Sequence, residues 1–281
     1  MNIKEKRVSF NKTLKKSAKS ALKGNWGPSI IISVIIVVLE LVVAIGETAL
    51  IALFDNFGIT HFLHKNIFVH VDFSAETAVE LLVALLCTLI SFSFIAPLLV
   101  GEIRWYCKVF DNSHVKIREL FHFYKTPRLY FKSVFVMLSV FLQRLWWAIL
   151  IFIVPITAFA LSSVLIEGET VISQGFGIVA LVIGTGFLGI GIVFFLKIYL
   201  DFSLASHVLA EDETIKVSKA IKISKNTMHK NEVKLLVLKL TFLPLELVEI
   251  FFFPLFFIMP YYHATHVAFA RHFLKEHNPI K

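Results

Sequence analysis

Long apolar runs constrain this chain more than any other feature of its sequence. Residues 28–54 read PSIIISVIIVVLELVVAIGETALIALF, and residues 77–100, 133–163 and 176–200 are similarly apolar. A membrane-spanning helix needs about 20 predominantly apolar residues, so each of these runs is long enough to cross a bilayer. The first run also carries Glu40 and is much longer than the apolar core of a cleaved signal peptide, which has about 7–15 residues.

A last apolar region extends from residue 235 to residue 270 and is interrupted by Pro244, Pro254 and Pro260. Because it is too long for one comfortable span, we divide it into a short fifth helix and a sixth helix. The predicted spans are 28–54, 77–100, 133–163, 176–200, 235–250 and 251–270.

The composition agrees with a chain that uses lipid as a solvent. Hydrophobic residues make up 57% of the 281 residues and charged residues 17%, against about 45–50% and about 25% in ordinary soluble domains. We predict an all-α fold, a polytopic transmembrane helical bundle of about six spans with amphipathic interfacial helices at the N-terminus and in the cytoplasmic connections. The predicted parts are a basic amphipathic cytoplasmic segment at 1–27, a single transmembrane domain at 28–270 and a cytoplasmic tail at 271–281.

The placement of lysine and arginine predicts the orientation in the membrane. These residues number eight in 1–27, seven in 101–132 and six in 201–234, but one in 55–76 and none in 164–175. Cytoplasmic loops carry an excess of Lys and Arg, so the N-terminus and both long basic connections are predicted to lie in the cytoplasm. The basic tail favours six spans over five, because an even number returns the C-terminus of this multi-pass cell-membrane protein to the same side.

The segment before the first span predicts an amphipathic helix at residues 9–23. One face carries Phe10, Leu14, Ala18, Ala21 and Leu22, and the other carries Lys12, Lys15, Lys16, Lys19 and Lys23. A helix of this kind lies at the level of the lipid headgroups, where each lysine contributes about 1 kcal/mol of attraction to an anionic leaflet. The alternative is a solvated basic arm without lipid contact.

The turn after this helix carries signals of its own. Gly24 is suited to end a helix in the left-handed conformation, Trp26 suits the membrane interface, and Pro28 is tolerated in the first turn of the next helix. We therefore predict an interfacial anchor that binds anionic headgroups of the lipid bilayer at the cytoplasmic face, and we predict no nucleic-acid partner. The anchor residues are Lys15, Lys16, Lys19, Lys23 and Trp26.

The connection 201–234 predicts a second amphipathic helix on the cytoplasmic side. Ile215, Ala220 and Ile223 are apolar, and they are flanked by Lys216, Lys219 and Lys222. Such a helix is suited to dock on lipid headgroups or on a partner protein, and a solvated helix is an equal alternative.

Four stretches of the sequence resemble a bacterial integral-membrane family known as "domain of unknown function 975". ALKGNWGPSI resembles the start motif of the family, and three later stretches resemble its other motifs. The matching positions are Pro97, Leu98, Gly101, Leu120, Phe121, Phe123, Tyr199, Leu209, Ala220, Ser224, Met228, Lys230, Pro260, Tyr261, Thr265 and Ala268. The chain departs from the family at His229-Lys230-Asn231, where a glycine is usual. The resemblance implies a multi-span bacterial membrane protein and no particular activity.

Ionisable residues inside the apolar runs are the strongest functional signal, because charge is costly in lipid. Glu40 and Glu47 are two helical turns apart and share one face of the first span, while Arg144 lies in the third. Together they form a candidate polar intramembrane cluster that would line a pathway or relay protons. The alternatives are a structural ion pair between helices, or an Arg144 side chain that extends to the inner face beside Trp146.

Small residues in the fourth span predict close helix packing in lipid. Ala180 with Gly184 and Thr185 with Gly189 form two pairs with four-residue spacing, and we predict that they line a close-packed seam rather than a channel.

The chemistry of the sequence favours a non-enzymatic membrane protein. His263 with His266, and Glu246 with Glu249, are the only signals of a membrane-embedded enzyme, and no nearby ligand completes a metal set with the two histidines. We therefore predict no catalytic residue, no cofactor and no metal. The favoured function is membrane organisation or partner binding in the bacterial envelope, and the alternative is a small transporter or channel that uses Glu40, Glu47 and Arg144.

Overall fold

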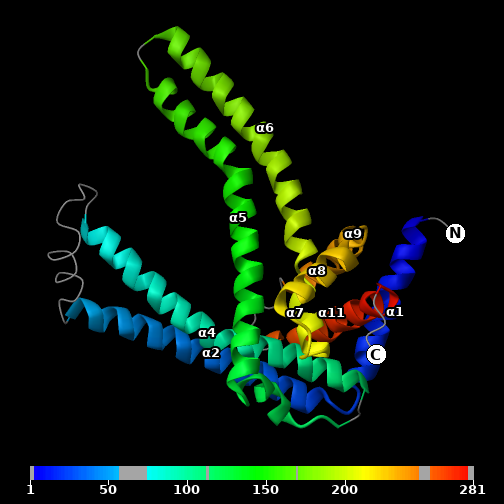
Figure 1. The fold of residues 1–281 in the computed structure, drawn as a ribbon. Helices are drawn as coiled ribbons and strands as arrows, with labels where there is room; N and C mark the ends of the chain where they lie inside the picture. Colours follow the sequence, from blue (N-terminus) through cyan, green and yellow to red (C-terminus); the bar gives the residue numbers. More distant parts are fainter. Residues whose placement is uncertain (1–2, 57–74, 112–113, 169, 247–253, 278–281) are drawn as a thin grey trace. The chain divides into compact units, whose positions relative to one another are not determined.

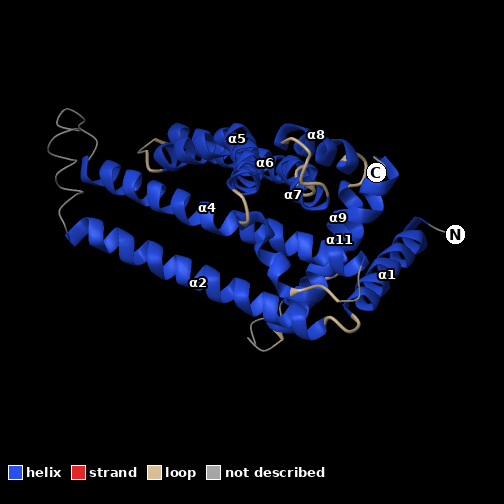
Figure 2. Ribbon diagram, turned by 60° about the horizontal axis from the view of Figure 1, so that its bottom comes forward, coloured by secondary structure: helices blue, strands red, loops and turns tan. Residues whose placement is uncertain are grey.

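The fold is described from a computed structural model of the chain (Figure 1). The structure describes residues 3–56, 75–111, 114–168, 170–246 and 254–277. Within these ranges every regular element is helical and no strand occurs (Figure 2). The all-α fold class predicted from the sequence is therefore confirmed.

Eleven helical elements are described. They are α1 (Ile3–Leu22), α2 (Trp26–Asn56), α4 (Ala75–Asp111), η1 (Ile117–Tyr124), α5 (Pro127–Ile166), α6 (Val171–Asp201), α7 (Ala205–Glu211), α8 (Val217–Met228), α9 (Glu232–Leu240), α10 (Leu243–Glu246) and α11 (Leu255–His277). The element η1 is a 3₁₀ helix and the others are α-helices.

Four stretches are long and apolar enough to cross a membrane. They are Trp26–Leu53, Leu82–Asp111, Pro127–Ile166 and Val171–Glu211. They contain most or all of each of the first four predicted spans, whereas a total of about six spans is not confirmed. Many of their apolar side chains are exposed, including Val164 at 70% and Val193 at 69%, as expected of helices that face hydrocarbon rather than a water-facing core.

The predicted fifth helix is wrong as one continuous element. Helix α9 ends at Leu240 and α10 covers only Leu243–Glu246. At the break, the Thr241 hydroxyl donates a hydrogen bond to the Leu238 carbonyl at 2.6 Å. Pro244 explains the break, because proline has no N–H to donate to the carbonyl four residues earlier, that of Leu240, and its ring clashes with that carbonyl in a continuous helix. Residues 247–250 of this prediction lie outside the described residues.

The predicted sixth helix corresponds to α11, which is longer than expected and continues to His277. From Ala264 to Leu274 most of its side chains are buried, and Thr265 and Phe269 are fully so. The burial explains why an apolar run near the C-terminus need not be a span, because its apolar side chains pack on protein instead of lipid.

The helices group into two compact units. The first unit comprises Met1–Val134 with Phe242–Arg271, and the second comprises Phe135–Thr241 with His272–Lys281. This grouping concerns packing alone, so the single transmembrane domain at 28–270 stays a prediction.

In the first unit, α2 and α4 form an antiparallel pair (Figures 1 and 2). Towards the end of this pair that holds the start of α2, the two helices pack with α1, η1 and α11 around one apolar cluster. Its fully buried members include Leu22, Ile32, Trp105, Leu120 and Ala264. Five elements, from α1 at the start of the chain to α11 near its end, are therefore joined by a single core.

Gly101 sets the closest approach in this unit. A Cβ atom at Gly101 would lie 1.9 Å from the carbonyl oxygen of Leu120, far inside any allowed contact. The backbone of η1 therefore lies directly on α4, and the side chains of Leu120 and Phe123 are fully buried beside it. Only glycine permits this approach.

In the second unit, α5 and α6 form another antiparallel pair. Three glycines of α6 line the seam between the two helices and face larger side chains of α5. A Cβ atom at Gly177 would meet Ile166, one at Gly184 would meet Ala158 and Phe159, and one at Gly191 would meet Ile151. The three glycines are seven residues apart, close to two turns of helix. They let two helices approach closely.

Of the four residues predicted to line the seam, the structure places Gly184 in the contact between α5 and α6. A Cβ atom at Gly189 would meet nothing within 4 Å. The Thr185 hydroxyl bonds to the Leu181 carbonyl of its own helix. Four-residue spacing selected the wrong partners because the real contact repeats every seven residues.

We expect Gly101→Ala to destabilise the protein by about 1–3 kcal/mol, because a methyl group must displace the backbone of η1. Gly46→Ala is the matched control, since Gly46 is also within a helix and has open space around its Cα. The control should gain about 0.5–1 kcal/mol from lower backbone entropy in the unfolded chain. Thermal unfolding of the purified full chain in detergent measures both, and equal melting temperatures for the two variants would contradict the contact.

Candidate functional site

A polar cluster centred on the buried Glu102 lies within the first unit where α2, α4 and α11 meet. The carboxylate of Glu102 on α4 is 3.6 Å from Nδ1 of His263 on α11, and Glu102 is only 3% exposed. The His263 ring stacks on Tyr106, with 5.9 Å between ring centroids and 13° between planes. Glu40 on α2 lies close enough to interact electrostatically with both Glu102 and His263.

Glu102 is the functional candidate that the sequence analysis missed. It follows Gly101 directly and was assigned to the cytoplasmic connection 101–132, whereas α4 continues to Asp111. The available signal was spacing, because Leu98, Glu102 and Tyr106 are four residues apart and share one face of a helix. A carboxylate on the same helix face as apolar and aromatic residues is expected to be buried with them.

The predicted cluster of Glu40, Glu47 and Arg144 is distributed differently in the structure. Glu47 accepts a hydrogen bond of 2.8 Å from the Thr88 hydroxyl, which joins α2 to α4. Glu40 belongs with Glu102 and His263. Arg144 lies in the second unit, so its pairing with Glu40 stays a prediction.

Within the second unit, Arg144 connects α5 to the end of α6. Its Nη2 donates to the Tyr199 carbonyl at 3.0 Å, and its guanidinium carbon lies 4.1 Å from the centroid of the Tyr199 ring. Lys239 also lies 5.2 Å from this ring centroid. These cation–π contacts support the structural interpretation of Arg144 over a relay.

The two histidines of α11 face different aromatic partners. His263 stacks on Tyr106, and His266 stacks on Tyr262 at 6.1 Å. In the part of the chain that the structure describes, no group of three or more His, Cys, Asp or Glu residues is close enough to hold a metal ion. Glu249 and the side chain of Glu246 lie outside the description.

The opening helix forms as predicted, with its left-handed stop. Helix α1 ends at Leu22, Gly24 has a φ of +86°, and α2 begins at Trp26. Pro28 therefore lies in the first turn of α2.

The apolar face of α1 contacts protein rather than lipid. Leu14, Ala18 and Leu22 are buried, and the partly buried Trp26 packs against the same core. Lys15 lies 4.2 Å above the Phe242 ring and Lys19 lies 5.4 Å from the Tyr261 ring centroid. Burial, followed by the charge of Lys19, lowers the pKa of Lys15. Contact between α1 and lipid headgroups stays a prediction. The exposed lysines of α1 and of the turn after it would make this contact, and they are Lys12, Lys16, Lys19 and Lys23.

Helix α8 confirms the amphipathic helix predicted in 201–234. Its apolar face is buried in the second unit through Ala220, Ile223 and Met228. Lys219, Lys222 and Lys225 of the helix are exposed, as is Lys216 directly before it. The Ser224 hydroxyl donates to the Asp201 carbonyl at 2.8 Å and accepts from the Leu204 N–H at 3.1 Å, which fixes α8 to the turn after α6.

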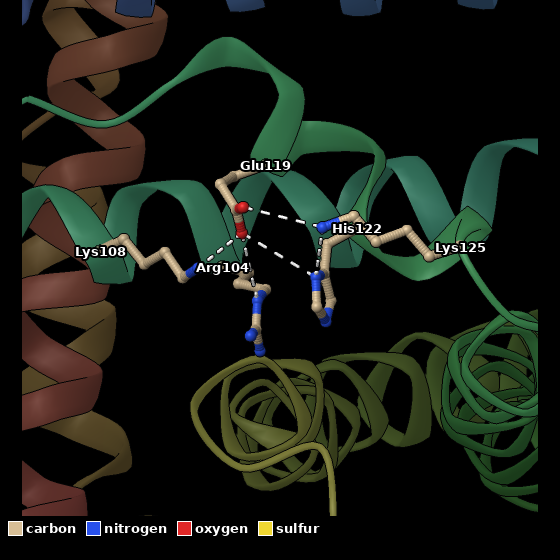
Figure 3. Close-up of polar contacts among 5 residues, drawn as sticks. All are labelled: Arg104, Lys108, Glu119, His122 and Lys125. Atoms are coloured by element: carbon tan, nitrogen blue, oxygen red, sulfur yellow. Dashed lines mark hydrogen bonds and ion pairs between the residues drawn. The ribbon is translucent and has the colours of Figure 1, made fainter.

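Figure 3 shows a second charged cluster, centred on Glu119 of η1. Lys108 donates to the Glu119 carboxylate at 2.5 Å. Arg104 Nε, His122 Nδ1 and Lys125 Nζ lie at 3.9, 3.9 and 3.8 Å from its oxygens. The hydrogen bond from Lys108 lowers the pKa of Glu119, which burial opposes and the surrounding charges reinforce. The cluster holds η1 against the end of α4 by charge, next to the close approach at Gly101.

The family model described as a protein of unknown function (DUF975) matches residues 9–277. The chain belongs to this family. No curated protein and no solved structure matches the DUF975 chain.

The structure gives physical reasons for several DUF975 motif positions. Gly101 and Leu120 make the close approach of α4 to η1, the Tyr199 ring makes a cation–π contact with Arg144, and the Ser224 hydroxyl fixes α8. Lys230 adopts a φ of +73°, a conformation that costs an L-residue roughly 1–2 kcal/mol and glycine little. The glycine that is usual near this position in the family therefore suits a left-handed turn, which this chain makes with lysine.

Stability should depend on the charge of Glu119. Because the folded pKa is depressed, the contribution is present above the unfolded pKa of about 4.3 and is lost as the pH falls through the folded pKa. We expect Glu119→Gln to lower the free energy of unfolding at neutral pH by about 1 kcal/mol, given that the cluster is partly screened by solvent. Thermal unfolding from pH 3 to pH 7 measures the difference from wild type, which should vanish at the acid end.

The exposed Glu167 provides the control for this measurement. Glu167→Gln should leave the melting temperature unchanged across the same range. A constant deficit of Glu119→Gln at all pH values would show that shape rather than charge supports η1.

Proposed function

We propose that this protein is a non-enzymatic integral membrane protein of the bacterial envelope that organises anionic lipid around two lysine-rich helices. One observation carries the proposal. Leu14, Ala18 and Leu22 of α1 and Ala220, Ile223 and Met228 of α8 are buried against the protein, while four lysines on or directly beside each helix are exposed. Their basic faces are therefore available to a negatively charged surface.

The topology supports this placement. When each of the four apolar stretches crosses the bilayer once, the N-terminus, the region of η1 and the residues after α7 lie on the same side of the membrane. These parts contain the three most basic segments of the chain, as the excess of Lys and Arg in cytoplasmic loops requires. We therefore propose a cell-membrane location with both termini in the cytoplasm.

The polar residues within the apolar helices support a structural role. Arg144 binds the Tyr199 carbonyl, and Glu47 accepts a hydrogen bond from Thr88. Each of these contacts joins two helices, which is what a polar group with a structural role is expected to do. The exposed lysines on and beside α1 and α8 are available to act on a partner.

Lipid selectivity tests the proposal directly. The full chain is reconstituted with spin-labelled phosphatidylglycerol or phosphatidylcholine, and the motionally restricted lipid fraction is measured. We expect wild type to favour phosphatidylglycerol, and replacement of Lys12, Lys16, Lys19 and Lys23 by glutamine to reduce that preference several-fold, since each lysine near an anionic leaflet contributes about 1 kcal/mol.

Arginine at the same four positions is the matched control and should retain the preference. High salt should weaken it in wild type, because exposed charges are screened over about 8–10 Å at 0.10–0.15 M ionic strength. Undiminished selectivity in the glutamine variant would contradict the proposed role of α1.

Transport is the second candidate, favoured by the cluster of Glu40, Glu102 and His263. A carboxylate as buried as Glu102 within an apolar helix is costly and is a reasonable proton or cation carrier. If the protein transports protons, Glu102→Gln should abolish flux in proteoliposomes loaded with a pH-sensitive dye. Glu47→Gln is the control and should retain flux, because Glu47 is engaged with Thr88. Wild-type flux no greater than that of protein-free liposomes would exclude this function.

A further inference from the structure

We propose that a groove in the second unit binds one anionic phospholipid, with an acyl chain between α6 and α9 and the phosphate at Lys197 and Lys230. The groove has a volume of about 420 Å³, within the range of about 300–1,000 Å³ that is typical of small-molecule sites. The inference rests on the proposed function only for the placement of the protein in a membrane. It adds a single site of defined stoichiometry.

The walls of the groove are apolar and come from two helices. Helix α6 contributes Val193, Leu196 and Leu200, and α9 contributes Val233 and Leu236. Val193 is 69% exposed and Val233 is 50% exposed. Because α6 belongs to a stretch that is long and apolar enough to span the membrane, the wall on its side is suited to hydrocarbon. A hydrocarbon chain is therefore the part of a ligand that these walls favour.

The rim of the groove is positively charged. Lys197, His229 and Lys230 line it together with one acid, Glu232. With His229 neutral, two lysines against one carboxylate leave a net charge of +1. Lys225 and the half-buried Asp201 also act on this region, and their opposite charges leave that balance unchanged. An anionic headgroup complements such a rim, whereas a zwitterionic headgroup brings a further cation to it.

The backbone at Lys230 is a second, independent observation. Lys230 is the one residue other than glycine with a positive φ among the described residues. A strained conformation of this kind points to a functional constraint when a less strained residue is available, and glycine would remove the strain. The lysine at this turn places a positive charge at the edge of the groove.

Native mass spectrometry of the full chain in detergent tests the site. Delipidated protein is titrated with phosphatidylglycerol and, separately, with phosphatidylcholine, and the first bound lipid is counted. We expect one phosphatidylglycerol to bind at least about fivefold more tightly than phosphatidylcholine, the effect of about one lysine near an anionic headgroup.

Three variants separate the charge of the rim from the apolar walls. Lys197→Gln and Lys230→Gly should each weaken binding of the first phosphatidylglycerol by about fivefold. Lys230→Gly should at the same time raise the melting temperature, because it relieves the left-handed strain, so weaker binding cannot be ascribed to unfolding. Val233→Trp retains every charge and should block the acyl chain, which lowers the affinity for both lipids.

Lys116→Gln is the matched control and should bind like wild type, because Lys116 is exposed and lies outside the groove, α1 and α8. Equal affinity for the two lipids, wild-type binding by Lys197→Gln and Lys230→Gly, or an equal loss in Lys116→Gln would each overturn the site. Unchanged binding by Val233→Trp with competition by inorganic phosphate would also overturn it, in favour of a simple anion site. If the preference measured by spin-labelled lipid fails while the first lipid still binds, the proposed function fails and this inference stands.

Discussion

The approach of the Leu120 carbonyl to Gly101 is the constraint on which the first unit depends. It places the backbone of η1 directly on α4, so that Leu120 joins the core formed by α1, α2, α4 and α11. The Glu119 cluster lies one residue away and adds charge pairing between the same two elements. A methyl group at Gly101 would push η1 away from α4. This would weaken the packing of Leu120 and the ion pairs of Glu119 together, because both lie in the same interface between α4 and η1.

The burial of their apolar sides explains why α1 and α8 present basic faces to the surroundings. Two amphipathic helices, α1 and α8, bury their apolar sides against their own units, through Leu22 in one case and Ile223 in the other. A helix that has satisfied its apolar face by packing has no apolar surface left to insert into lipid. In the proposed function the lysines therefore act at the membrane by charge, so salt concentration and the lipid headgroup are the variables to test.

Polar groups within the apolar helices divide into two kinds. Glu47 and Arg144 each bind a group on a neighbouring helix and stabilise a helix pair. Glu102 is different, because the carboxylate is nearly sealed from solvent beside His263 and close to Glu40. In lipid, an ionisable group of this kind is costly and is retained where it has a function or a fixed partner. It is therefore the position from which the transport alternative is best examined.

The sequence by itself determined the four long apolar helices, the stop at Gly24 and the amphipathic pattern of α8, because each follows from local composition and spacing. It did not determine which partner each face would meet. The tertiary structure decided that α1 packs on protein, that α11 is mostly buried between Ala264 and Leu274, that the glycine seam repeats every seven residues, and that Glu102 is buried. These outcomes depend on contacts between segments far apart in the chain, and an apolar face has the same spacing whether lipid or protein covers it.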